Sequence, residues 1–334
     1  MADESSSEAA CRGVHRRRFL AVSAASSVAV AGCLSLSSDE EIEDWHDLDA
    51  VRDDLDEDYA LTNDLSEQTA GYSEHVDDPE EGWEPVGEFE RGTDLEFSGT
   101  FDGQGHEIAD LRIDRPETTY VGLFGVNKGT IENVTVADAD ITGDRVVGGL
   151  IGQTHETVMG STVRESEITG ESGVGGIAGV IIRDGDVSLS SVREAEITGG
   201  EHVGGLAGTV ASFGRASNSA VRDVIITGVE RVGGFAGFLF GGSVTNSWVS
   251  GNVSGEDTVG GFAGEQHVGG QLTGYWNTAV TGQMQGLGTG VKSVTGLTAD
   301  EMKGEAAKEN MQALDFEETW TIRTDPDDYP VFNV

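Results

Sequence analysis

The chain has 334 residues, enough for one large domain, and it carries 60 acidic against 20 basic side chains, a formal net charge of −40. Nucleic acid is excluded as a partner, because a phosphate backbone requires a basic patch. Glycine accounts for 49 residues without the three-residue period of collagen, which indicates frequent turns. The acids are spread through apolar, periodic sequence, so we interpret them as the solvated surface of a salt-adapted, halophilic protein, since strong salt screens their repulsion.

Residues 1–32 are typical of an export signal. Arg16 and Arg17 begin a run, R-R-R-F-L, that resembles the twin-arginine signature, and a short apolar stretch follows it. The stretch ends in V-A-G-C, which resembles a lipobox and predicts cleavage before Cys33 and lipidation of Cys33. A signal peptide in which Cys33 is incidental is the alternative. A stable anchor would need two acyl chains, and with Cys11 removed no disulfide is left to form.

The signal predicts a protein exported by the twin-arginine route and lipid-anchored at the outer face of the cytoplasmic membrane. Residues 33–44 are rich in serine and then in acids, which predicts a flexible tether. Residues 45–85 predict an N-terminal cap that begins with a helix, because Trp45, Leu48, Val51 and Leu55 fall on one side of it. A strand is predicted over residues 59–64.

The middle of the chain is repetitive. A phrase V-G-G-hydrophobic-small-G recurs every 27 to 29 residues, and an I-T-G or V-S-G phrase recurs with the same offsets. The valines that open the first phrase are Val147, Val174, Val203, Val232 and Val259. The apolar positions three residues later are Leu150, Ile177, Leu206, Phe235 and Phe262. A third apolar column is predicted at Val136, Val163, Val192, Val221 and Trp248.

Three short β-branched segments per repeat cannot bury a face alone, but coils stacked about 4.8 Å apart close one continuous core. The sequence therefore predicts an all-β fold, a right-handed parallel β-helix over residues 86–275, with glycine corners that allow positive φ or close backbone approach. Leucine-rich repeats are excluded because their L-x-x-L-x-L spacing and asparagine column are missing. Calcium-binding nonapeptide repeats are excluded because their period is far shorter.

The last segment, residues 276–334, predicts an α/β cap. Thr298 to Glu301 forms a capping box that opens a helix running to about Leu314 and interrupted by Gly304. Trp320 and Phe332 are expected to pack near the last coil. Caps at both ends cover the strand edges, so we expect a monomer.

The repeat phrase resembles the GLUG motif. "FSGTFDGQGHEIADLRI" (97–113), "YVGLFG" (120–125), "GTIENVTV" (129–136), "YWNTAVTG" (275–282) and "YPVF" (329–332) are also similar to segments of GLUG-motif repeat proteins. The likeness covers nearly all of the chain beyond residue 45. It implies a β-helix in a surface-attached or secreted microbial protein, here a lipoprotein of the haloarchaeal type. It implies no agreed activity, and no catalytic module accompanies the repeats.

Two charged columns point outward in the predicted coils. Arg164, Arg193 and Arg222 recur in register, beside Asp138, Glu165, Glu194 and Asp223. Like charges in neighbouring coils repel, so we interpret the two columns as a salt-bridged face. Binding of cations or acidic glycans on this face is the alternative.

Catalytic signals are sparse. Asp102 and His106, within one glycine-rich turn, are the best lone acid–imidazole candidate, but such turns are routine in the first coil of the family. The remaining histidines, outside the signal, show no metal-ligand spacing: His46, His75, His155, His202 and His267. We therefore predict no catalytic residues, no metal and no cofactor.

The corner loops that follow two VGG phrases, residues 180–191 and 209–220, are two residues longer than their counterparts, and "FLFGG" (238–242) is unusually apolar for a turn. Loops on one side of a solenoid commonly carry recognition. The predicted binding edge comprises Asp184, Asp186, Phe213, Arg215, Phe238 and Phe240.

These observations predict a non-catalytic, cell-surface adhesin or envelope-binding scaffold whose partners are envelope glycans or surface proteins. The alternatives are a secreted carbohydrate-active β-helix enzyme, a polysaccharide lyase or glycosidase, and a purely architectural envelope protein. Lyases and glycosidases need one singular cluster of carboxylates, whereas the polar columns here repeat in every coil.

Overall fold

The computed structural model describes residues 39–89, 95–291, 293–323 and 328–333. The predicted signal residues Arg16 and Arg17 and the predicted lipid site Cys33 lie outside these ranges. Among the described helices none is long and apolar enough to cross a membrane.

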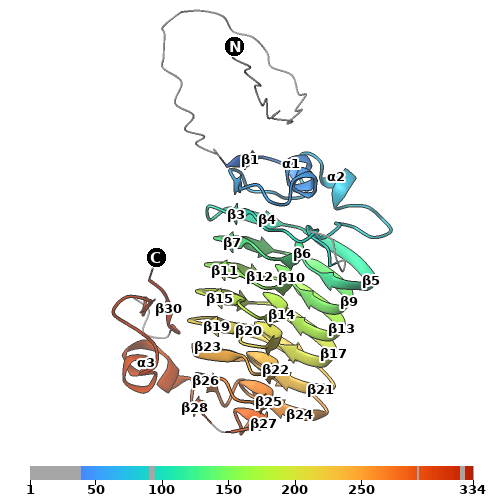
Figure 1. The fold of residues 1–334 in the computed structure, drawn as a ribbon. Coiled ribbons are helices and arrows are strands. Elements are labelled where there is room, and N and C mark those ends of the chain that lie inside the picture. The colour runs from blue at the N-terminus through green and yellow to red at the C-terminus, as the bar shows by residue number, and fades with distance from the viewer. Residues whose placement is uncertain (1–38, 90–94, 292, 324–327, 334) are drawn as a thin grey trace, which may run out of the picture. The chain divides into compact units, whose positions relative to one another are not determined.

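Short strands stack in parallel to form a β-solenoid (Figure 1). Val147 pairs with Val174, and the same column continues through Val203, Val232 and Val259. Each valine therefore lies on the corresponding valine of the next coil, as the repeat predicts. The parallel solenoid is confirmed, and its core is one continuous cluster of buried side chains.

A seven-stranded sheet forms one face of the coils. Its strands are β6 (Phe124–Asn127), β10 (Ile151–Thr154), β14 (Ala178–Ile182), β18 (Ala207–Ala211), β22 (Ala236–Phe240), β25 (Ala263–Val268) and β27 (Leu287–Thr289).

A 21-stranded sheet wraps the other faces. The first set of stacked strands is β3 (Thr100–Asp102), β7 (Thr130–Glu132), β11 (Thr157–Met159), β15 (Asp186–Ser188) and β19 (Arg215–Ser217). The second is β4 (Glu107–Ala109), β8 (Thr135–Ala137), β12 (Thr162–Arg164), β16 (Ser191–Arg193), β20 (Ala220–Thr227), β23 (Ser243–Ser254), β26 (Leu272–Asn277) and β28 (Thr295–Leu297). The third is β5 (Arg112–Val121), β9 (Asp140–Gly148), β13 (Glu167–Gly175), β17 (Glu196–Gly204), β21 (Glu230–Gly233) and β24 (Asp257–Gly260).

The corners between faces use two devices. In the VGG phrases glycine is needed for close approach: a Cβ on Gly205 would lie 2.2 Å from the carbonyl oxygen of Gly234 in the next coil. Another corner is turned by a left-handed residue in several successive coils. The acidic column occupies it, with φ between 49° and 56° at Asp138, Glu165, Glu194 and Asp223. Positive φ at these corners is thus carried by acids rather than by glycine.

A serine ladder, absent from the sequence predictions, runs inside one corner. The backbone N–H of Ser161 donates to the hydroxyl of Ser190 at 3.3 Å, and the N–H of Ser190 donates to Ser219 at 3.3 Å. The Ser190 hydroxyl in turn donates to the carbonyl oxygen of Ser188 at 2.8 Å. All three ladder serines are fully buried, so each hydroxyl satisfies backbone groups that no strand partner reaches.

The predicted core position of Trp248 is wrong by one residue. Val249, not Trp248, continues the column of Val221, and Trp248 pairs with Ala220. The register between β20 and β23 shifts between Arg222 and Ile225, because β23 is one residue shorter across this corner. Trp248 therefore faces outward, where the C-terminal segment buries it.

The N-terminal segment contributes strands to the stack of coils and is not a separate cap in front of it. β1 (Glu40–Ile42) pairs with β2 (Tyr59–Leu61), which pairs with β3. The tether predicted over 33–44 is thus wrong in its last part, because Ile42 is buried in the core. The predicted helix is present as α1 (Trp45–Ala50), continued by a 3-10 turn (Val51–Asp53). A short helix, α2 (Tyr72–His75), follows β2.

The C-terminal segment contains a 3-10 turn (Asp300–Met302), α3 (Gly304–Asn310), and a hairpin of β29 (Trp320–Thr321) and β30 (Val331–Phe332). The capping box is confirmed: the N–H of Thr298 donates to Glu301 at 2.8 Å and the N–H of Glu301 donates to Thr298 at 3.3 Å. The long helix to Leu314 is broken into shorter pieces.

The predicted position of this segment at the last coil needs correction. It lies along the side of several coils (Figure 1), where Tyr329 stacks on Trp248 with ring centroids 5.1 Å apart. It does so because Ala220, Trp248 and Tyr275 present an apolar outer face that water would otherwise meet.

Candidate functional site

Five residues of the predicted binding edge lie in or beside the turn that follows the seven-stranded sheet in three successive coils, and the sixth, Phe238, lies two residues before it on the outer face of β22. Asp186 pairs with Arg215 in the strand register, and the turn after β18 stacks on the end of β22, since the N–H of Ser212 donates to the carbonyl oxygen of Phe240 at 2.8 Å. The structure therefore brings these residues to one edge, although they come from separate repeats.

Four rings gather on the outer face of β22 and its neighbours. Phe238 stacks on His202 with centroids 4.9 Å apart and an interplanar angle of 13°. Phe240 stacks on His267 at 5.7 Å and 16°, and the two phenylalanine rings are 6.0 Å apart. We name these four residues the aromatic platform. Phe240 is 44% exposed, so the platform presents apolar ring surface to solvent.

Charged side chains border the aromatic platform. Arg231 donates from Nε to Glu265 at 2.6 Å and is 2.7 Å from Glu230, while its guanidinium lies 5.6 Å from the Phe238 ring centroid. The hydrogen bond to Glu265 raises the pKa of Arg231 above its ordinary value. Burial, with Arg231 nearby, lowers the pKa of His202. The imidazole of His202 is therefore neutral near pH 7. Because the charged groups that border the aromatic platform are paired with one another, the platform suits an uncharged polar ligand.

The rest of the predicted edge differs from the aromatic platform. Phe213 is 81% exposed at the tip of its turn and stacks on no ring within the described ranges. Arg215 and Asp186 form an ion pair at 3.1 Å, which neutralises both. Asp184 is exposed in the turn that precedes β15. Of the six residues, Phe238 and Phe240 thus belong to the aromatic platform, and the other four do not.

Sequence reasoning missed His202, Arg231 and His267 as neighbours of these phenylalanines. A signal was present for two of them: His202 and Arg231 each directly precede a VGG phrase, so they occupy the same repeat position. Both adopt left-handed backbone, with φ of 54° and 55°. Stacked coils bring such positions together automatically.

The arginine column is in register, since Arg164 pairs with Arg193 and Arg193 with Arg222. Arg164 is 2.5 Å from Glu107 and also pairs with Glu165, and Arg222 is 2.8 Å from Asp223. Arg193, in contrast, has no ion-pair partner among the described residues. The expected salt-bridged face is therefore incomplete.

A groove of about 350 Å³ lies between this face and the C-terminal segment. Arg193, Arg222 and Arg323 line it together with Trp248 and Trp320. The groove is cationic in a strongly acidic chain, but Arg222 is partly neutralised by Asp223 and by Asp328 at 3.7 Å.

Asp102 and His106, the acid–imidazole candidate, do not pair. His106 Nδ1 lies 2.9 Å from Asp64, while the carboxylate of Asp102 accepts from the N–H of Gln104 and from Asn133. The pKa of Asp64 is lowered, first by the hydrogen bond from the N–H of Glu107 and then by His106. The geometry matches an exposed surface pair.

Comparisons with known proteins support the fold. No family model matches the chain, so the GLUG resemblance stays a sequence-based prediction. A 69-residue segment, 20% of the chain, is 42% identical to halomucin of Haloquadratum walsbyi, of whose length it spans 1%. The crystal structure of a Bacteroides ovatus protein, named provisionally as an immunoglobulin A1 protease, superposes with a TM-score of 0.66 and 19% identity. That match covers 90% of this chain and 93% of the other, and it shows the β-solenoid fold alone.

Proposed function

We propose that the chain is a non-catalytic surface protein of a salt-adapted microorganism, anchored through lipid at Cys33 after twin-arginine export, that binds envelope glycans through the aromatic platform. The segment similar to halomucin supports an extracellular setting. The net charge of −40 supports life in strong salt.

The aromatic platform is the observation that carries the proposal. Exposed, stacked rings offer flat apolar surface, which packs against the C–H faces of sugar rings, and bordering polar groups bond the hydroxyls. Arg231, Glu230 and Glu265 supply such groups beside Phe238. An isolated exposed phenylalanine needs no explanation, but four contiguous rings on one outer face do.

The test is binding of the full chain to purified envelope glycans in molar KCl. Phe240→Ala and Phe238→Ala are expected to weaken binding about 5- to 30-fold, because each removes about 1–2 kcal/mol of ring contact. Phe89→Ala is a matched control, since Phe89 is 45% exposed and packs on Tyr120, whose position in the repeat is that of His202 but three coils earlier.

Equal binding by the platform variants and the control would overturn glycan recognition at this surface. Binding to envelope proteins instead, lost in the same two variants, would assign the surface to a protein partner. A lower melting temperature in the platform variants would indicate that Phe238 and Phe240 have a structural role. No observation on the described residues favours the enzyme alternative, since Asp102 and His106 do not pair with each other.

A further inference from the structure

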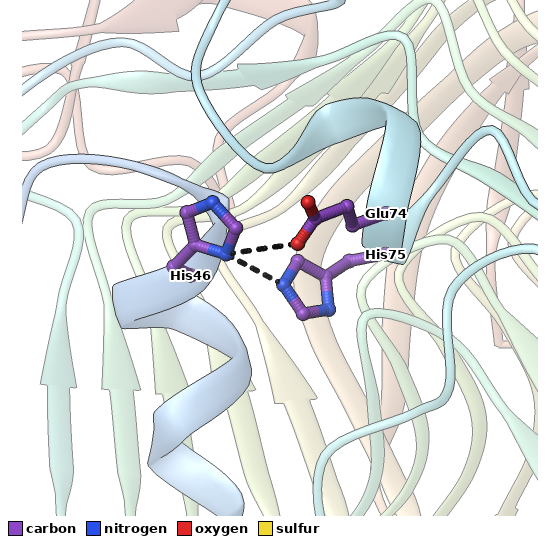
Figure 2. A group of neighbouring side chains, drawn as sticks. All are labelled: His46, Glu74 and His75. Atoms are coloured by element: carbon purple, nitrogen blue, oxygen red, sulfur yellow. Dashed lines mark hydrogen bonds and ion pairs between the residues drawn. The ribbon is translucent and has the colours of Figure 1, made fainter.

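Two histidines that are far apart in the sequence meet beside the N-terminal helices (Figure 2). His46, in the first turn of α1, places Nδ1 2.9 Å from Nε2 of His75, the last residue of α2. The carboxylate of Glu74 lies 3.8 Å from the same nitrogen of His46. Three potential ligand atoms thus face one point, all within 4.8 Å of one another.

The fold holds His46 in place from both sides. The Asp44 side chain caps α1 and accepts from the N–H of His46 at 2.9 Å. Gly71, with φ of 84°, leaves room for the imidazole, because a Cβ there would lie 3.0 Å from the backbone nitrogen of His46 and 3.1 Å from two carbons of its ring. The neighbouring Trp45 is fully buried in the core. His46 is therefore positioned by rigid elements although its ring is exposed.

A carboxylate orients His75. Its Nδ1 lies 3.4 Å from the side chain of Asp49, which also pairs with Arg52. A carboxylate on one imidazole nitrogen keeps the proton there and leaves the other nitrogen with a free lone pair. In His75 the nitrogen left free is Nε2, which faces His46.

We infer that His46, His75 and Glu74 form a binding site for one divalent transition-metal ion of the zinc, copper or nickel class. Imidazole nitrogens suit these ions, and two histidines with one carboxylate are a common ligand set. Nitrogens about 2.1 Å from one ion lie about 3.0 Å apart at a right angle and about 3.4 Å apart in a tetrahedron. The observed 2.9 Å matches the first of these.

The ligand set leaves positions for water, because the side chains of His46 and Glu74 are 49% and 71% exposed. An ion here would add a link between α1 and α2, which are separated by 21 residues of chain and already pack through Trp45 and Tyr72. Since a preformed site is absent from the unfolded chain, binding would stabilise this N-terminal segment of the solenoid.

The test titrates the tag-free, chelator-treated full chain with Zn²⁺ and, separately, Cu²⁺ in molar KCl with excess Mg²⁺, which saturates non-specific acidic sites. We expect one saturable site and a melting temperature that rises with ion concentration. His46→Ala and His75→Ala should each abolish both responses, and His106→Ala is the matched control, because its ring pairs with Asp64 outside this cluster.

Asp49→Asn tests the positioning role: it should weaken affinity about 10- to 100-fold while one ion still binds. The spectrum of bound Cu²⁺ should report two nitrogen ligands both in the unchanged chain and in Asp49→Asn. Unchanged binding in His46→Ala and His75→Ala would overturn the proposal. Absence of saturable binding would also overturn it and would leave a hydrogen bond between the two rings.

Discussion

The chain at β22 places aromatic rings both inside and outside the solenoid, and the two sides differ in how often their pattern recurs. On the inner side Phe235 precedes the strand, is fully buried and stacks on Phe262 of the next coil at 5.2 Å and 1°. On the outer side Phe238 stacks on His202 at 4.9 Å. The inner stack occupies a column that is apolar in every coil, whereas the outer column at Phe238 changes from coil to coil and holds Gln153, Val180, Thr209 and Glu265 in neighbouring coils. Repetition therefore serves the core, and the singular surface is where recognition can reside.

The largest difference between the two sides should be in stability. Phe235→Ala is expected to lower the free energy of unfolding by about 3–5 kcal/mol, because it leaves a cavity between coils. Phe240→Ala should change it by less than about 1 kcal/mol, since the ring is already 44% exposed. Denaturant unfolding in molar KCl measures both, and similar losses in the two variants would contradict the distinction.

A smaller effect is expected at the corner glycines. Gly205→Ala should cost about 1–3 kcal/mol, because its Cβ would meet the Gly234 carbonyl oxygen at 2.2 Å and a methyl group of Val221 at 2.6 Å. Gly269→Ala is the control, since nothing lies within 4 Å of its Cβ position. Melting temperatures of the two variants test this, and an equal change in both would show that inter-coil contact is not the reason for glycine.

The repeated part of the fold could be predicted from the sequence because nearly every repeat has the same spacing between its apolar positions, which sets the register of the stacked coils. The valine of each VGG phrase and the residue three places later recur at fixed offsets, so their burial follows from stacking. The prediction failed at Trp248, where β23 lacks one corner residue and the column passes to Val249. The column was predicted by counting a fixed number of residues back from the I-T-G or V-S-G phrase. Such a count misses a residue that is absent between the column and the phrase.

The candidate sites were less predictable than the core, because their residues depart from the repeated pattern or lie outside it. Phe238 and Phe240 could be singled out because they are apolar where a turn was expected. His46 and His75 lie outside the repeat, and only the packing of α1 against α2 brings them together. The serine ladder did leave a signal, since Ser161, Ser190 and Ser219 recur with the repeat offset. Small polar residues are common, however, and their burial depends on the corner that encloses them.

The smallest expected effect concerns His202, whose ring joins the aromatic platform to the charged rim. Burial and the nearby Arg231 lower the pKa of His202 below its ordinary 6.5, although Glu201, Glu230 and Glu265 act in the opposite direction. The unfolded chain then binds a proton more readily than the folded one. The contribution of His202 to stability is therefore complete above about pH 6.5 and is lost as the pH falls through the lower pKa of the folded state.

The measurement compares melting temperatures of the unchanged chain and His202→Gln from pH 7.5 to pH 5, with the ring followed by NMR titration. The unchanged chain should lose more stability on acidification than the variant, and the ring should titrate below 6.5. Arg231→Gln should move that titration upward, because it removes a neighbouring positive charge. A ring that titrates above 6.5 in the unchanged chain would show that Glu201, Glu230 and Glu265 dominate. His202 would then carry charge near neutral pH, and the aromatic platform would favour an anionic ligand over a neutral sugar.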